Sequence, residues 1–205
     1  VSFQYPDGEA PVLRDITFEA RRGDTIAFIG STGSGKSTLI NLIPRFYDIS
    51  SGSIRIDNVD VRRYDLKALR EKIGFIPQKA LLFTGSINEN IRYGKHNAVQ
   101  TEVEHSAKVA QAYDFITEKP KQFEEMIEEG GGNVSGGQRQ RLSIARAVVR
   151  KPDIYIFDDS FSALDFKTDA NLRKQLKYET KDAITLIVAQ RVTSCLLYTS
   201  DAADE

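Results

Sequence analysis

Residues 30–38 have the types and spacing that bind nucleotide phosphates. They read Gly-Ser-Thr-Gly-Ser-Gly-Lys-Ser-Thr, which fits the P-loop pattern. Glycines let successive backbone N–H groups converge on phosphate oxygens, and the lysine can reach the β- and γ-phosphates. We therefore expect a phosphate site formed by Ser31, Thr32, Gly33, Ser34, Gly35, Lys36, Ser37 and Thr38.

Two oxygen-bearing side chains are candidates for holding Mg²⁺. One is the Ser37 hydroxyl, and the other is the carboxylate of Asp158, which ends the apolar run at 154–158. An Asp at the end of a strand is weak evidence alone, but downstream of a P-loop it is typical of a carboxylate that holds the metal directly or through water.

A third motif, Val-Ser-Gly-Gly-Gln at 134–138, precedes a basic amphipathic stretch that runs to Arg150. Gly136 and Gly137 allow close approach of the backbone, and Ser135 offers a hydroxyl at the start of a helix. This turn, with Gln138, is a candidate anion-binding site at the start of a helix.

Alternating strands and helices must position these motifs, which predicts an α/β protein. The periodicity predicts a buried strand over 24–30 and a further strand from the alternation of Val1, Phe3 and Tyr5. Between 84 and 150 we expect helices without strands, as in an inserted helical subdomain. The other expected strands are 53–57, 73–76, 153–158 and 183–189, and the expected helices are 36–43, 86–92, 101–110, 138–150 and 166–178.

Composition suits one globular domain, because the 205 residues are 40% hydrophobic and 28% charged. The apolar stretches are shorter than the roughly 20 residues that cross a bilayer, so we expect membrane association only through a fused membrane domain. The net charge is −1, and the basic residues near 139–151 alternate with apolar ones, so nucleic acid is not an expected partner.

Both ends of the chain indicate a fragment of a longer protein. The sequence starts at Val1 inside a strand pattern, without an initiator methionine. Residues 195–205, which include the only cysteine, Cys195, resemble the translation of a transposase-derived sequencing adapter. We therefore expect a domain over 1–194, truncated at both ends, followed by a non-native tail.

Together, the P-loop, Asp158 and the Ser-Gly-Gly-Gln turn resemble the nucleotide-binding domain of ATP-binding cassette (ABC) transporters. The segments 29–40 with 44–47, and 82–91 with 93–94, are similar to those of exporters whose ATPase domain follows a membrane domain on one chain. The resemblance implies a P-loop NTPase core (RecA-like sheet with flanking helices and an N-terminal antiparallel β part) over 1–83 and 151–194, with the helical signature subdomain at 84–150. It also implies ATP and Mg²⁺ as cofactors.

The same resemblance implies partners and a location. Two such domains sandwich two ATP molecules head to tail, so that the signature turn serves the partner's nucleotide. Coupling helices of a transmembrane domain are the other implied partner, contacted by Glu129 and a groove at Phe83. Either residue could instead have an ordinary structural role. The domain would lie at the cytoplasmic face of the cell membrane.

Further roles follow only from the resemblance. Tyr5 matches the aromatic residue that stacks on adenine. Gln78 matches a glutamine that contacts Mg²⁺ or the attacking water, and residues 162–165 match a loop that connects the two ATP sites across the dimer.

Two residues of the hydrolytic machinery depart from the family's pattern. Asp159 stands where a catalytic Glu is usual, and Gln190 stands where a His contacts the γ-phosphate. The shorter carboxylate is pulled back by more than about 1 Å, a displacement that can cost on the order of 100-fold in rate. Gln can donate a hydrogen bond to phosphate but carries no positive charge.

These departures favour one half of a heterodimeric exporter whose own P-loop site hydrolyses ATP slowly. The alternative is an active site with tolerated substitutions or errors in the read, as in a homodimeric exporter. A separately encoded importer ATPase and a soluble ABC ATPase of DNA repair or translation are further alternatives. The absence of long coiled-coil insertions and of a second cassette disfavours the soluble class.

Overall fold

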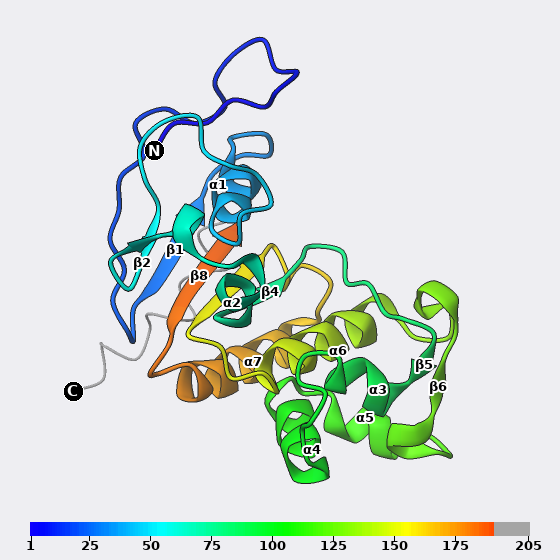
Figure 1. Cartoon of the computed structure of the whole chain (residues 1–205). Helices are drawn as coiled ribbons and strands as arrows, with labels where there is room; N and C mark the ends of the chain where they lie inside the picture. The colour runs from blue at the N-terminus through cyan, green and yellow to red at the C-terminus, as the bar shows by residue number, and fades with distance from the viewer. Residues whose placement is uncertain (191–205) are drawn as a thin grey trace, which may run out of the picture.

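A central parallel sheet organises the chain in a computed structural model that describes residues 1–190. The expected tail at 195–205 therefore lies outside the described residues. The strand order is β1 (Thr25–Ile29), β8 (Ile184–Ala189), β7 (Ile154–Asp158) and β4 (Ile73–Ile76), and every neighbouring pair is parallel (Figure 1). Because the strands are parallel, their carboxyl ends lie at one edge, where the P-loop and Asp158 follow β1 and end β7.

Alternating side chains of β7 pack into two different hydrophobic clusters. Ile154 and Ile156 join a cluster with Ile40 of α1 (Lys36–Leu42) and Leu69 of α2 (Leu66–Glu71). Tyr155 and Phe157 join the cluster that includes α6 (Gly136–Val148) and α7 (Phe166–Glu179). Helices therefore cover both faces of the sheet, and the expected α/β class with a parallel sheet is confirmed.

The expectation of a buried first strand is wrong. In β1, Thr25, Ala27 and Ile29 are exposed, while Ile26 and Phe28 are half-buried. β1 lies at the edge of the described sheet, with β8 as its one neighbour there, and only Ile26 and Phe28 of this strand pack against the hydrophobic clusters of the described residues. An apolar run alone does not distinguish such an edge strand from a central one.

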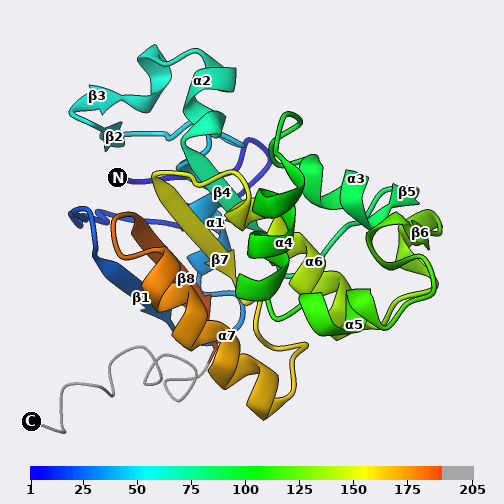
Figure 2. The same cartoon turned by 90° about the horizontal axis from the view of Figure 1, so that it is seen from below.

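The helical part lies beside the sheet on the side away from β1 (Figure 1, Figure 2). It contains α3 (Ile87–Arg92), α4 (Gln100–Val109), α5 (Tyr113–Thr117) and α6, which packs against both α3 and α4. The expectation of no strand at 84–150 is wrong, because β5 (Gly85–Ser86) pairs with β6 (Met126–Ile127) in antiparallel fashion. Strands this short carry no readable periodicity.

The N-terminal alternation does not form a regular strand. It is reduced to isolated antiparallel bridges, Ser2 with Ser51 and Phe3 with Leu13. Phe3 is nevertheless buried, so burial of one side chain rather than a continued ladder produces the pattern. The antiparallel hairpin nearby consists of β2 (Arg55–Ile56) and β3 (Val59–Asp60).

Short 3₁₀ turns complete the described elements, at Val61–Arg63, Gln122–Glu124 and Glu129–Gly131. Among residues 1–190, no helix combines the length and the apolar character that crossing a membrane requires.

Candidate functional site

The P-loop connects β1 to α1 through glycines in left-handed conformations. Gly33 and Gly35 have φ values of 83° and 86°, which residues with a Cβ rarely adopt. A Cβ on Gly35 would also lie 3.0 Å from the Leu13 side chain. The turn therefore requires glycine at Gly35 for backbone and packing reasons together.

Lys36 folds back over this loop. Its Nζ donates to the carbonyl oxygens of Gly30 at 2.8 Å and Ser31 at 2.7 Å, and to Ser34 Oγ at 3.0 Å. These bonds hold a positive charge inside the predicted phosphate-binding turn, and phosphate oxygens could replace the same acceptors.

Ser37 and Asp158 meet across the ends of α1 and β7. The Ser37 hydroxyl donates to Asp158 Oδ1 at 2.8 Å. Burial raises the pKa of Asp158, the Ser37 hydroxyl opposes that rise, and Asp159 adds to it. A hydroxyl and a carboxylate side by side are hard oxygen ligands, so this pair fits Mg²⁺ and its residues would hold the ion.

Tyr5 reaches α1 from the N-terminal segment. Its hydroxyl shares a hydrogen bond of 3.0 Å with Thr38 Oγ1. Its ring packs edge-on against Phe3 and Tyr47, with centroids 4.8 and 5.2 Å away, and stays partly exposed. The structure thus joins Tyr5 to the P-loop helix, while its stacking on adenine stays a prediction.

Asp159 is bound by two amides from distant segments. Gln78 Nε2 and Gln190 Nε2 each donate to Asp159 Oδ2 at 3.1 Å. Asp159 has φ +46°, in the left-handed region that Asp tolerates better than most residues. The three predicted hydrolytic residues therefore converge next to Asp158, although their roles stay predictions.

The signature turn begins α6 with a capping box. Ser135 Oγ accepts from the Gln138 backbone N–H at 3.2 Å, and the Ser135 N–H donates to Gln138 Oε1 at 3.1 Å. Helix α6 consequently begins two residues before the expected start at 138 and ends at Val148 rather than 150. Within residues 1–190, no hydrogen bond joins Ser135 or Gln138 to the P-loop.

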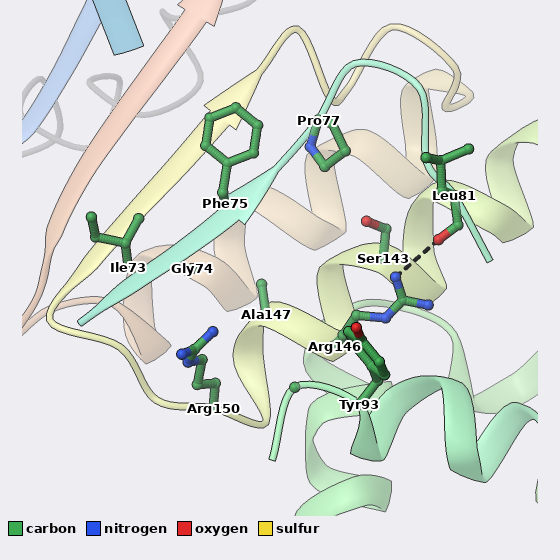
Figure 3. A pocket seen from close by; sticks show the side chains of 11 residues that line it. Ile73, Gly74, Phe75, Pro77, Leu81, Tyr93, Ser143, Arg146, Ala147 and Arg150 are labelled. Atoms are coloured by element: carbon green, nitrogen blue, oxygen red, sulfur yellow. Dashed lines mark hydrogen bonds between the residues drawn. The ribbon is translucent and has the colours of Figure 1, made fainter. Parts of the chain in front are cut away.

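A pocket lies between β4, α6 and the segment after Gln78, with a cavity volume of about 200 Å³ (Figure 3). Arg146 points along it and donates to the Leu81 carbonyl at 2.9 Å and to the backbone oxygen of Asn90 at 2.8 Å. Its guanidinium also lies over the rings of Phe83 and Tyr93, both exposed by about half. Phe83 therefore lies at the surface beside two lining residues of the pocket, Tyr93 and Arg146, rather than in the core. Glu129 is exposed in its 3₁₀ turn.

Three contacts near the site were not predicted from the sequence. Gln140 and Asn90 are each only 2% exposed. Gln140 Nε2 donates to the Pro77 carbonyl, directly before Gln78, and Asn90 Oδ1 accepts from Arg146. The Ala163 carbonyl lies against Gly137. The only local signal was polar residues on otherwise buried helix faces.

Comparison with known proteins decides the family. The model of the family described as ABC transporter matches residues 13–162. The chain belongs to the ABC transporter family. The recognition of an ABC domain from the sequence is confirmed, while the roles of its individual residues stay predictions.

Relatives of this ABC domain include exporters. Over 194 residues the chain is 46% identical to proteins of Staphylococcus aureus, strains NCTC 8325 and bovine RF122, that carry the name multidrug export ATP-binding/permease protein. In each case 95% of this chain and 34% of the relative are covered, so the chain spans about a third of their length.

A solved structure is also similar to this ABC domain. It is a bacterial Atm1-family ABC exporter with ATP bound, with a TM-score of 0.90 and 35% sequence identity. The match covers 95% of this chain and 34% of that one.

Proposed function

We propose that this chain is the ATP-binding and ATP-hydrolysing domain that powers export of a substrate across a membrane. The observation that carries the proposal is the Ser37–Asp158 hydrogen bond, which joins the P-loop to the carboxylate that would hold Mg²⁺. Bound there, Mg²⁺ would neutralise charge on the β- and γ-phosphates. The protein's part is to bind and orient: Lys36 would release its carbonyl acceptors and donate to phosphate.

ATP-dependent head-to-tail dimerisation with a second ABC domain is the second part of the proposal. Ser135 and Gly136 are exposed, and their turn is shaped by its own capping box rather than by contact with the chain's own P-loop. A turn prepared in this way can complete the ATP site of another domain. Its backbone N–H groups and the Ser135 hydroxyl would supply donors to that γ-phosphate.

We propose further that the chain's own P-loop site hydrolyses slowly and that the partner is a different chain. Asp159 is one methylene shorter than the usual glutamate, and both amide contacts converge on one of its oxygens. Gln190 offers a neutral donor where the family pattern has histidine. In this proposal the signature turn of this chain completes the ATP site at the partner's P-loop, which hydrolyses ATP faster.

The pocket around Arg146 is proposed to receive coupling helices of a transmembrane domain, and Glu129 is proposed as a further contact with them. Its support is a hollow next to the Gln78 segment that is lined in part by the half-exposed Tyr93, with the half-exposed Phe83 packed against Tyr93. In this proposal residues 1–83 and 151–194 form the ATP-binding core, 84–150 form the helical subdomain, and the domain lies at the cytoplasmic face of a membrane.

Single-site turnover tests the proposal directly. The full-length chain is combined with its partner half, whose own P-loop lysine is replaced, and release of phosphate from this site is measured. We expect hydrolysis on the order of 100-fold slower than at the reciprocal site. Equal turnover at the two sites, or loss of all activity on Asp159→Ala as complete as on the matching partner substitution, would refute the slow-site assignment.

A further inference from the structure

The Asp159 carboxylate joins three segments that are remote in sequence. Oδ2 accepts from Gln78, which follows β4, and from Gln190, which follows β8, while Asp159 itself follows β7. Both bonds are charge-assisted, which makes them stronger than bonds between neutral groups. One oxygen thus fixes two of the side chains that surround the predicted γ-phosphate position.

Further hydrogen bonds hold the two segments that carry Asp159 and Gln78. Ser160 is 1% exposed and donates from Oγ to the Ile76 carbonyl at 2.8 Å, while the Asp159 N–H donates to the Val188 carbonyl at 3.1 Å. On the other side, buried Gln140 donates to the Pro77 carbonyl beside Gln78. The backbones next to the carboxylate and next to Gln78 are therefore both held by hydrogen bonds other than the one between these two side chains.

The chemistry of a carboxylate dictates how the amides face it. An ionised carboxylate only accepts hydrogen bonds, so each glutamine must present its NH₂ group to Asp159. This leaves the carbonyl oxygen of Gln78 for a cation and the second N–H of Gln190 for an anion. A neutral Asn at 159 would bind one NH₂ group less strongly and could turn its own NH₂ toward the other amide.

We propose that Asp159 is a positioning residue that orients Gln78 toward Mg²⁺ and Gln190 toward the γ-phosphate, so that this site retains MgATP. The inference rests on the proposed slow P-loop site, and it assigns to that site the retention of bound MgATP. It also reverses the usual expectation for a carboxylate next to the metal ligand. Replacing a water-polarising carboxylate with its amide prolongs ATP retention, whereas replacing a positioning carboxylate shortens it.

The experiment measures how long radiolabelled ATP stays bound to the full-length protein, assembled with a partner half whose own P-loop lysine is replaced. Asp159→Asn is compared with Asp153→Asn, which removes the same charge at the opposite end of β7, where Asp153 pairs with Arg22 and Lys72. With Mg²⁺ we expect Asp159→Asn to shorten retention about tenfold, the order expected for losing a hydrogen bond to a charged group. Asp153→Asn should leave retention unchanged.

A double-mutant comparison separates positioning from general damage. Gln78→Ala should shorten retention with Mg²⁺ but not with EDTA, and it should add little in the Asp159→Asn background because the two residues act together. Asp159→Glu keeps the charge but moves it, and should also shorten retention while the melting temperature stays unchanged.

The contrary outcomes are distinct. Unchanged or longer retention in Asp159→Asn would overturn the positioning role, and so would additive losses with Gln78→Ala. If the proposal of a slow site is wrong, the unsubstituted protein will show it instead, because its P-loop site will turn over ATP as fast as the partner's site.

Discussion

Gly137 lies directly against the backbone carbonyl of Ala163, so that a Cβ on Gly137 would sit 3.2 Å from that oxygen. The signature turn therefore touches the loop that leads away from Asp159 within the same chain. The Ser162 hydroxyl donates to the Asp159 carbonyl at 3.0 Å and completes a short connection between the two. We therefore expect a change at Gly137 to reach Asp159 through Ala163 and Ser162.

Gly137→Ala tests this connection. The added methyl group must displace the Ala163 carbonyl by a few tenths of an ångström, and we expect partner-site turnover to fall roughly threefold to tenfold, since a 1 Å misplacement costs about 100-fold. Hydrogen exchange at 162–165 should accelerate. Gly136→Ala is the control for exchange, because its Cβ would meet only Arg139 Nη2 at 3.9 Å. Equal exchange in both variants would contradict the connection.

Lys36→Ala should weaken binding of MgATP by roughly 10- to 100-fold, because a hydrogen bond to a charged group contributes about 1.5–3 kcal/mol. Titration with a fluorescent ATP analogue measures the loss. Lys67→Ala, at an exposed position on α2, is the matched control and should bind normally. Normal binding in Lys36→Ala would remove Lys36 from the phosphate site.

Gly94→Ala should destabilise the domain strongly. A Cβ there would lie far inside contact distance of the Arg146 carbonyl oxygen, so α6 or the segment after α3 must shift. Overpacking of this kind costs about 1–3 kcal/mol or more, which lowers the melting temperature of a domain this size by roughly 2–12 °C. Gly132→Ala has only ordinary contacts, at 3.6 Å and beyond, and should melt like the unsubstituted protein. Equal melting of the two variants would show that the close approach is absent in solution.

Arg146→Lys keeps the charge but loses the planar fork that serves Leu81 and Asn90 at once. The acceptors on Asn90, a residue only 2% exposed, would lose a donor, so we expect about 2 kcal/mol less stability in urea unfolding. Arg150→Lys, on the rim of the same pocket, should change stability by less than about 0.5 kcal/mol. Similar losses in both variants would show that the fork contributes nothing specific.

The sequence predicted local features more reliably than long-range contacts. The strand Ile73–Ile76 has the predicted bounds, because its apolar run is short and clearly delimited. The P-loop conformation follows from its glycines, since Gly33 and Gly35 adopt the left-handed backbone that the motif needs. In both cases the determining interactions lie within a few residues.

Contacts between distant segments could not be predicted in the same way. Nothing near Asp159 indicates that Gln78 and Gln190 share one of its oxygens, and nothing near Arg146 points to Asn90. The exposure of Thr25, Ala27 and Ile29 likewise depends on which strand lies at the edge of the sheet. These properties depend on how the sheet and the helices pack against one another. The spacing of residues along the chain does not predict that packing.

The pairing of β1 with β8 also bears on how the domain is made. The strand that carries the P-loop finds its described neighbour at Ile184–Ala189, and Ser37 finds Asp158 121 residues later. During synthesis the phosphate-binding turn must therefore wait for most of the domain to leave the ribosome. Contacts between residues so far apart in sequence form slowly, and apolar surface stays exposed until they have formed. We therefore expect the nucleotide site to be among the last parts of the fold to form, so that the capacity to bind ATP reports completed folding of the sheet.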